Sequence, residues 1–284
     1  MSYFTSCLIC NSTRLAILDD YKKDHLCKCR DCGFVFAQKK PGLQELLDEY
    51  AKYSRSNVIS DITIKRYAGL LDLFEKYRAN NTIIDVGAGD GHFIESAKQA
   101  GWKAYATEFD DRAVELCRQK GVLVEQGKLD TDNYENDFFD IIFSSEVLEH
   151  INNPVEEIRN FNQILRKGGL VFITTPNLNS ISHKILKHKW NIFHYPEHLC
   201  YYTPKTLKKL FEDNGFKKIA IQTTGFSPSR FKHSLGQSEI NNDDENLRIK
   251  TENRFVWKAL KSIANFFFNL TKTGDAMKGM FVKI

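Results

Sequence analysis

The chain has 284 residues, of which 42% are hydrophobic and 27% are charged, and its formal net charge is +4. This length allows one sizeable domain with a small satellite, and the composition argues against a disordered or fibrous protein. The charge is too mild for the dense basic stripe of a nucleic-acid-binding protein, but it would attract a small anionic substrate.

Membrane and export signals are missing from the sequence pattern. No apolar run approaches the ~20 residues that a membrane helix needs. The first residues lack the basic start and apolar core of a signal peptide. We therefore expect a cytoplasmic protein.

Two Cys-x-x-Cys pairs dominate the first 40 residues, and they comprise Cys7, Cys10, Cys29 and Cys32. Four thiolates on two tight turns match the tetrahedral coordination of zinc, with Zn–S distances of about 2.3 Å. Because four sulfurs close the coordination shell, the predicted role of the metal is structural. We predict a zinc ribbon over residues 1–42, with short strands that end at Phe34–Phe36. Cys27 is interpreted as a buried strand residue.

Helical and strand-like patterns then follow in a regular order. Apolar residues three and four apart predict amphipathic helices from Leu43 to about Tyr53 and from Asp61 to Tyr77, which form a helical connector over residues 43–80. Strands are predicted at 82–86, 102–108, 122–124, 139–143 and 170–174, and helices at 91–100, 110–120 and 154–166. This alternation implies a parallel sheet covered on both faces. Gly168-Gly169 is expected to end the last of these helices.

The pattern changes after Pro176, where an insertion rich in histidine, lysine and aromatic residues spans 183–202. A helix from Thr203-Pro204 to Asn214 and a strand over 218–224 are predicted next. Residues 233–250 are polar and are expected to be mobile. We assign residues 81–232 to the main domain, and residues 233–284 to a helix at 255–270 and a final strand at 280–284 that complete it.

The most informative motif is the run Asp85-Val86-Gly87-Ala88-Gly89-Asp90-Gly91, in which glycine recurs at every second position after a predicted strand. Glycine lets the backbone approach a ligand closely. Glu108 ends the next strand, about 20 residues after the first glycine, and this spacing fits a carboxylate that binds the ribose hydroxyls of a nucleoside cofactor. By itself the motif could also be a tight turn without a ligand.

Together with the run from Phe139 to Ile151, this motif resembles the class I S-adenosylmethionine-dependent methyltransferases over about residues 60–225. The resemblance implies an α/β fold with a Rossmann-like, doubly wound, mostly parallel seven-stranded sheet, and S-adenosylmethionine as the cofactor. It assigns the cofactor contacts to Asp85, Gly87, Ala88, Gly89, Glu108, Phe109, Leu129 and Ser144. In this assignment Glu108 binds the ribose, Phe109 and Leu129 flank the adenine, and Ser144 lies near the methionine part.

A zinc ribbon on this core resembles a bacterial subgroup of sugar methyltransferases. The resemblance implies a small polar acceptor, namely a hydroxyl of a nucleotide-linked or phosphorylated sugar or of a surface-polysaccharide precursor, with carbon methylation of a sugar as the alternative. A hydroxyl acceptor needs a base, and histidine titrates near neutral pH. We predict His198 as this base and His194 as the second candidate, with Tyr195 or Glu197 as orienting groups. A structural hydrogen-bonding role is the other interpretation of these histidines.

Several alternatives stay open at this point. The basic residues Lys184, Lys187, His188 and Lys189 form either a solvated helix face or a grip on an acceptor phosphate. The rival functions are a nucleic-acid methyltransferase guided by the zinc module, a nicotinamide-dependent oxidoreductase, and a binding protein without turnover. The sequence favours a small-molecule partner over nucleic acid and predicts no membrane span.

Overall fold

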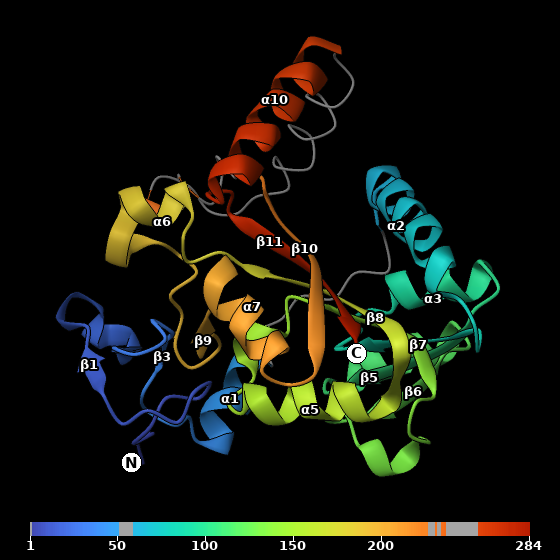
Figure 1. Cartoon of the computed structure of the whole chain (residues 1–284), viewed down its shortest axis with the longest axis horizontal. Coiled ribbons are helices and arrows are strands. Elements are labelled where there is room, and N and C mark those ends of the chain that lie inside the picture. The colour runs from blue at the N-terminus through green and yellow to red at the C-terminus, as the bar shows by residue number, and fades with distance from the viewer. Residues whose placement is uncertain (1, 51–58, 227–230, 232–233, 237–254) are drawn as a thin grey trace. The chain divides into compact units, whose positions relative to one another are not determined.

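The computed structural model describes residues 2–50, 59–226, 231, 234–236 and 255–284 (Figure 1). The predicted helical residues 51–53 lie outside the described residues, as does the predicted mobile stretch 233–250 apart from 234–236. The chain divides into two compact units, which are described separately. Unit 1 comprises Met1–Lys40, Thr175–Leu207 and Ile221–Lys278, and unit 2 comprises Pro41–Thr174, Lys208–Ala220 and Gly279–Ile284.

A seven-stranded sheet carries the predicted α/β fold. Its strand order is β10-β11-β8-β7-β4-β5-β6. The strands are β4 (Thr82–Val86), β5 (Lys103–Glu108), β6 (Leu123–Gln126), β7 (Phe139–Ser145), β8 (Leu165–Pro176), β10 (Phe216–Thr224) and β11 (Ala276–Lys283). Parallel pairing joins β4 to β5 and β7, β5 to β6, and β7 to β8. The predicted mostly parallel, seven-stranded sheet is confirmed.

The helices of this fold begin where the sequence supplies a suitable first residue. They are α1 (Leu43–Tyr50), α2 (Asp61–Phe74), α3 (His92–Gln99), α4 (Asp111–Gln119), α5 (Pro154–Ile164) and α7 (Pro204–Glu212). The Asp110 carboxylate caps α4 by accepting a hydrogen bond from the Ala113 N–H at 2.9 Å. Pro154 occupies the first turn of α5, where its missing N–H costs nothing.

The core of unit 2 is aromatic where α2 and α3 pack against the sheet. The Phe93 ring of α3 stacks on Phe143 of β7 at a centroid distance of 3.7 Å, and Phe143 stacks on Phe172 of β8 at 5.7 Å. Phe74 of α2 closes this cluster against Phe172. Alternate strand residues reach this face because successive side chains of a strand point to opposite sides. These rings join α2 and α3 to β7 and β8.

The prediction that Gly168-Gly169 ends a helix is wrong. Helix α5 ends at Ile164, and β8 begins at once with Leu165. The register between β7 and β8 shifts near Phe139, so the two glycines lie in an irregular part of the strand pair. A Cβ on Gly169 would stand 2.9 Å from the carbonyl oxygens of Arg166 and Asp140, so only glycine fits this close approach.

A four-stranded antiparallel sheet in unit 1 has the order β1-β2-β3-β9. Its strands are β1 (Leu15–Ile17), β2 (Leu26–Cys29), β3 (Val35–Ala37) and β9 (Cys200–Tyr201). Phe34 and Phe36 are fully buried, and the Phe34 ring packs on Tyr202 at 5.1 Å. Strand β9 was not predicted, because a two-residue strand has no local sequence signal and depends on its pairing with β3.

Unit 1 also holds the short helices η1 (Asp19–Asp24), α6 (Ile181–Leu186) and η5 (Lys187–Lys189), and the long helix α10 (Phe255–Thr271). The predicted helix over 255–270 is therefore confirmed. Within the described part of the chain, no helix combines the length and the apolar character that crossing a bilayer would require.

Candidate functional site

The predicted cofactor residues of unit 2 meet at one edge of the seven-stranded sheet. Asp85 of β4 pairs in register with Ala106 of β5 and Phe143 of β7. Since these strands are parallel, their carboxyl ends lie at the same edge, where open α/β sheets bind ligands. The structure thus brings the glycine turn, Glu108 and the end of β7 together, as the sequence predicted for a single site.

The turn after β4 depends on glycine. Gly87 and Gly91 have φ angles of 77° and 74°, in the left-handed region that other residues avoid. A Cβ on Gly87 would stand 2.4 Å from Cγ2 of Val147, and one on Gly91 would stand 2.6 Å from Sγ of Cys117. Both positions therefore require glycine for conformation and for space.

The N–H groups of this turn already have acceptors within unit 2. Those of Gly87 and Ala88 donate to the Thr107 carbonyl at 2.9 and 3.0 Å, and that of Gly91 donates to the Ala88 carbonyl at 3.0 Å. The Gly89 N–H donates to Oε2 of Glu108 at 2.7 Å. A phosphate-binding turn instead points its N–H groups at the anion. This turn is thus built for close approach rather than for holding a phosphate.

Glu108 joins the glycine turn to the start of α4. Its Oε1 accepts hydrogen bonds from the N–H groups of Phe109 at 2.7 Å and Asp110 at 2.9 Å, while Oε2 accepts the Gly89 N–H. A carboxylate oxygen accepts about two hydrogen bonds, so Oε1 is fully used and Oε2 retains capacity toward a ligand hydroxyl. The carboxylate is held in place before any ligand arrives.

Asp85 is only 2% exposed. Burial, together with the negative charge of nearby Glu108, raises the pKa of the Asp85 carboxyl well above its ordinary range. Glu108 is therefore the carboxylate beside the turn that suits a ligand with hydroxyl donors.

The other predicted cofactor residues differ in exposure. Phe109 follows Glu108 and is 47% exposed, so its ring is accessible to the adenine ring of a cofactor. Leu129 and Ser144 are buried, the latter within β7. Ala88 lies in the turn itself. The specific contacts proposed for these residues stay predictions.

Sequence reasoning assigned no role to Glu146, which follows β7 in a left-handed conformation with φ of 56°. Its Oε1 accepts a hydrogen bond from the Thr174 hydroxyl at 2.8 Å, and its N–H donates to the Thr174 carbonyl at 2.9 Å. Ser145 and Thr174 share a further hydroxyl contact at 2.8 Å. Strained non-glycine residues concentrate at functional sites, but their backbone conformation leaves no clear sequence signal.

The predicted histidines lie in unit 1. Nδ1 of His198 is 2.7 Å from the Ile192 carbonyl, which can only accept, so Nδ1 carries the hydrogen and Nε2 is the ring atom able to take up a proton. Nε2 lies 3.8 Å from Oε1 of Glu197. His194 places its Nδ1 2.7 Å from Oε2 of the same glutamate and is more exposed than His198. Glu197 therefore contacts both candidate bases.

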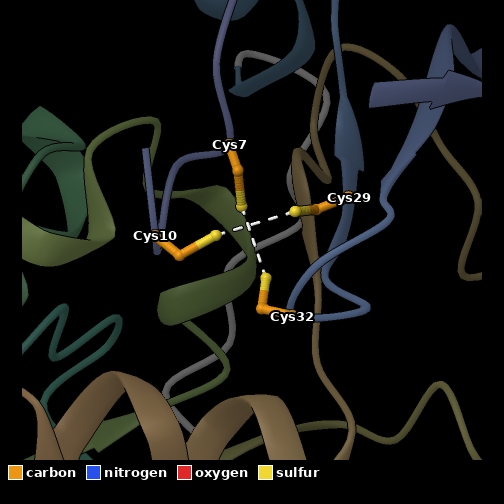
Figure 2. A group of neighbouring side chains, drawn as sticks. All are labelled: Cys7, Cys10, Cys29 and Cys32. Carbon is orange, nitrogen blue, oxygen red and sulfur yellow. Dashed lines mark hydrogen bonds between the residues drawn. The ribbon is translucent and has the colours of Figure 1, made fainter. Parts of the chain in front are cut away.

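The four predicted metal ligands of unit 1 converge, and Figure 2 shows their sulfurs pointing toward one another. The Sγ atoms of Cys7 and Cys32 are 3.5 Å apart, and those of Cys10 and Cys29 are 3.6 Å apart. All four lie within 4.8 Å of one another. Tetrahedral zinc thiolates with Zn–S of 2.3 Å would stand about 3.8 Å apart, so this four-cysteine cluster fits zinc.

Matching turns present the two cysteine pairs. The N–H of Asn11 donates to the Cys7 carbonyl at 3.0 Å, and that of Gly33 donates to the Cys29 carbonyl at 3.0 Å. Asn11 and Gly33 both have left-handed backbones. The predicted burial of Cys27 in a strand is confirmed, and burial raises the pKa of its thiol to about 12.

Comparison with known proteins agrees with this geometry. Residues 59–221, more than half of the chain, match a family described as a methyltransferase domain. The chain is 28% identical over 108 residues to a ubiquinone biosynthesis O-methyltransferase of Pseudomonas paraeruginosa, covering 36% of this chain and 47% of that protein. It is 27% identical over 112 residues to that of Nitrosomonas europaea, covering 37% and 48%. The chain thus spans about half the length of these two relatives.

Solved structures show the same fold. An S-adenosylmethionine-dependent methyltransferase from Archaeoglobus fulgidus superimposes with a TM-score of 0.54 at 17% identity, covering 85% of this chain and all of that one. Another from Mesorhizobium loti gives a TM-score of 0.50 at 14% identity, covering 76% and 100%. The matched family covers the glycine turn, Glu108 and the end of β7. The chain therefore belongs to the S-adenosylmethionine-dependent methyltransferases.

Proposed function

We propose that this protein transfers the methyl group of S-adenosylmethionine to a hydroxyl oxygen of a small polar acceptor. The main supporting observation is the turn at Gly87–Gly91, whose N–H groups are bonded within the protein and whose neighbours Asp85 and Glu108 are acidic. Because these N–H groups are used within the protein, the turn suits a nucleoside with ribose hydroxyls and no phosphate at this point better than a dinucleotide. The named relatives act on oxygen, which favours a hydroxyl acceptor over carbon methylation.

Two acceptor classes are candidates. The sugar hydroxyl of a nucleotide-linked or phosphorylated sugar, or of a polysaccharide precursor, is the prediction from sequence. The relatives are named for ubiquinone biosynthesis rather than for sugars, so a phenolic hydroxyl is the second candidate. Carbon methylation of a sugar is third, and we expect no nucleic-acid acceptor.

The bound cofactor would supply an activated methyl group. The protein must hold the cofactor, align the acceptor and accept the proton that the hydroxyl loses. We assign the last task to Nε2 of His198, with His194 as the second candidate. Replacing His198 by Asn should lower kcat at least about 100-fold with little change in cofactor affinity, and full turnover in this variant would exclude the assignment.

We further propose that the four-cysteine cluster holds a structural Zn²⁺. Four thiolates fill the tetrahedral shell, so the ion would leave no position for a substrate or water. Its contribution would be to fix the two cysteine turns on the small sheet of unit 1.

One screen tests the proposed activity. The purified chain is incubated with S-adenosylmethionine and with nucleotide sugars, phosphorylated sugars and polyhydroxylated phenols, and formation of S-adenosylhomocysteine is measured. Methylated products are located by mass spectrometry, and the Glu108→Gln variant serves as the control. A thermal shift with a nicotinamide dinucleotide but none with S-adenosylmethionine would refute the proposal, as would tight, salt-sensitive RNA or DNA binding that directs methylation to nucleic acid.

A further inference from the structure

Helix α10 places two asparagines against the end of strand β10 and leaves four apolar side chains exposed. Within unit 1, the side-chain oxygen of Asn265 accepts a hydrogen bond from the Gly225 N–H at 2.9 Å, and that of Asn269 accepts one from the Thr223 N–H at 3.2 Å. On the apolar side, Ile263 is 53% exposed, Phe266 65%, Phe267 55% and Leu270 68%. This is the reverse of the usual orientation of an amphipathic surface helix.

The exposed residues form a single stripe. Their spacing of three and four places them on one face of the helix, opposite the two asparagines. Large contiguous apolar surface on a protein in water marks an interaction site. Turning the stripe inward would break both asparagine hydrogen bonds.

Helix α6 lies at the end of α10 and adds to this surface. The Ile181 N–H donates to the Thr273 carbonyl at 2.9 Å, and Nδ2 of Asn179 donates to the Lys272 carbonyl at 2.9 Å. Ile185 on α6 is 59% exposed. Exposed basic residues lie next to Ile185 in the sequence or shortly after it, namely Lys184, Lys187, His188 and Lys189.

The charge of these segments is one-sided. Residues 177–196 and 254–274 contain no aspartate or glutamate, although the chain holds 36 acidic residues. Asp275, which follows the second segment, accepts a hydrogen bond from the Ser182 hydroxyl of α6 at 2.8 Å. A second copy of the same surface would therefore bring lysine against lysine with no carboxylate from these two segments to pair them. An anionic bilayer offers both acyl chains for the apolar stripe and negative headgroups for the lysines.

We infer that α10 and α6 form a peripheral binding surface for an anionic lipid bilayer. The helix lies in the interface with Phe266, Phe267 and Leu270 among the upper acyl chains, while the cations of α6 contact phosphate headgroups. This surface does not depend on which acceptor the enzyme methylates.

Vesicle co-sedimentation of the full chain tests the inference. We expect binding to vesicles of phosphatidylcholine mixed with phosphatidylglycerol, and weaker binding to phosphatidylcholine alone. A Phe267→Ser and Leu270→Ser double variant should lower the partition coefficient about tenfold or more, because it removes the inserted apolar area. A Lys184→Glu and Lys187→Glu variant should lose the preference for anionic lipid. The matched control is Leu123→Ser on β6, which removes an equally exposed leucine elsewhere.

Each preparation is checked by circular dichroism and by its thermal shift with S-adenosylmethionine, which these variants should retain. The inference is overturned if the wild type binds neither vesicle, or if the serine double variant binds as well as the wild type. It is also overturned if the wild type does not bind vesicles but forms a concentration-dependent dimer in sedimentation equilibrium that Phe267→Ser abolishes. The stripe would then pair with a second copy of the chain.

Discussion

Replacing Glu108 by Gln tests the central element of the cofactor site. The carboxylate accepts hydrogen bonds from the N–H groups of Gly89, Phe109 and Asp110 at 2.7, 2.7 and 2.9 Å. Glutamine keeps one acceptor oxygen and places an NH₂ group where the second oxygen was. One backbone N–H then faces another donor, and the ribose loses a charged partner.

The expected loss follows from the charge on this group. A hydrogen bond to a charged acceptor contributes about 1.5–3 kcal/mol, so loss of one such bond to the ribose should weaken cofactor binding about 10- to 150-fold. Fold stability should change less, because glutamine also removes the negative charge that adds to burial in raising the pKa of Asp85. We therefore expect this variant to lose affinity for the cofactor while its free energy of unfolding changes less.

Isothermal titration calorimetry with S-adenosylhomocysteine and its 2′-deoxy analogue measures the effect. The wild type should prefer the ribose compound, and Glu108→Gln should lose most of that preference. Glu115→Gln in α4 removes the same charge from an exposed position and is the matched control. Equal affinities in both variants, or an unchanged preference for ribose in Glu108→Gln, would refute the assignment.

Three further results are expected. Elemental analysis should find zinc bound by the four-cysteine cluster. Cys10→Ser should lower both the zinc content and the thermal stability, whereas Cys27→Ala should lower the stability without loss of zinc. A zinc-free but fully stable wild type would contradict this. Gly91→Ala should cost about 1–2 kcal/mol for its left-handed backbone plus the clash with Cys117, and Cys117→Ala should relieve only the clash, as measured by urea unfolding. Burial would raise the pKa of Asp140, but its arginine ion pair and three backbone hydrogen bonds outweigh burial and lower it. The stability that this carboxylate adds is therefore present above its unfolded pKa of about 3.9 and is lost as the pH falls below that value, and Asp140→Asn should show a smaller loss over that range.

Local patterns were sufficient to predict much of the fold. The strands β4, β5 and β7 and the helices between them were expected near their observed positions, because burial on both faces gives runs of apolar residues and helices give a different period. The cysteine pairs and the glycine turn were visible for a similar reason, since each depends on residues close together in the chain. Residue roles in catalysis, and the cytoplasmic location, stay predictions.

The amino-acid sequence alone determined the α/β class and the positions of the glycine and cysteine turns, because each depends on the spacing of residues close together in the chain; the cofactor was implied by the resemblance to a known family. Only the tertiary structure decided that β9 pairs with β3, that Gly168-Gly169 lies within a strand, and that Glu108 binds the Gly89 N–H. It also decided that Asn265 and Asn269 turn the apolar side of α10 outward. These features depend on contacts between residues distant in the chain, and local spacing carries no information about which distant groups will meet.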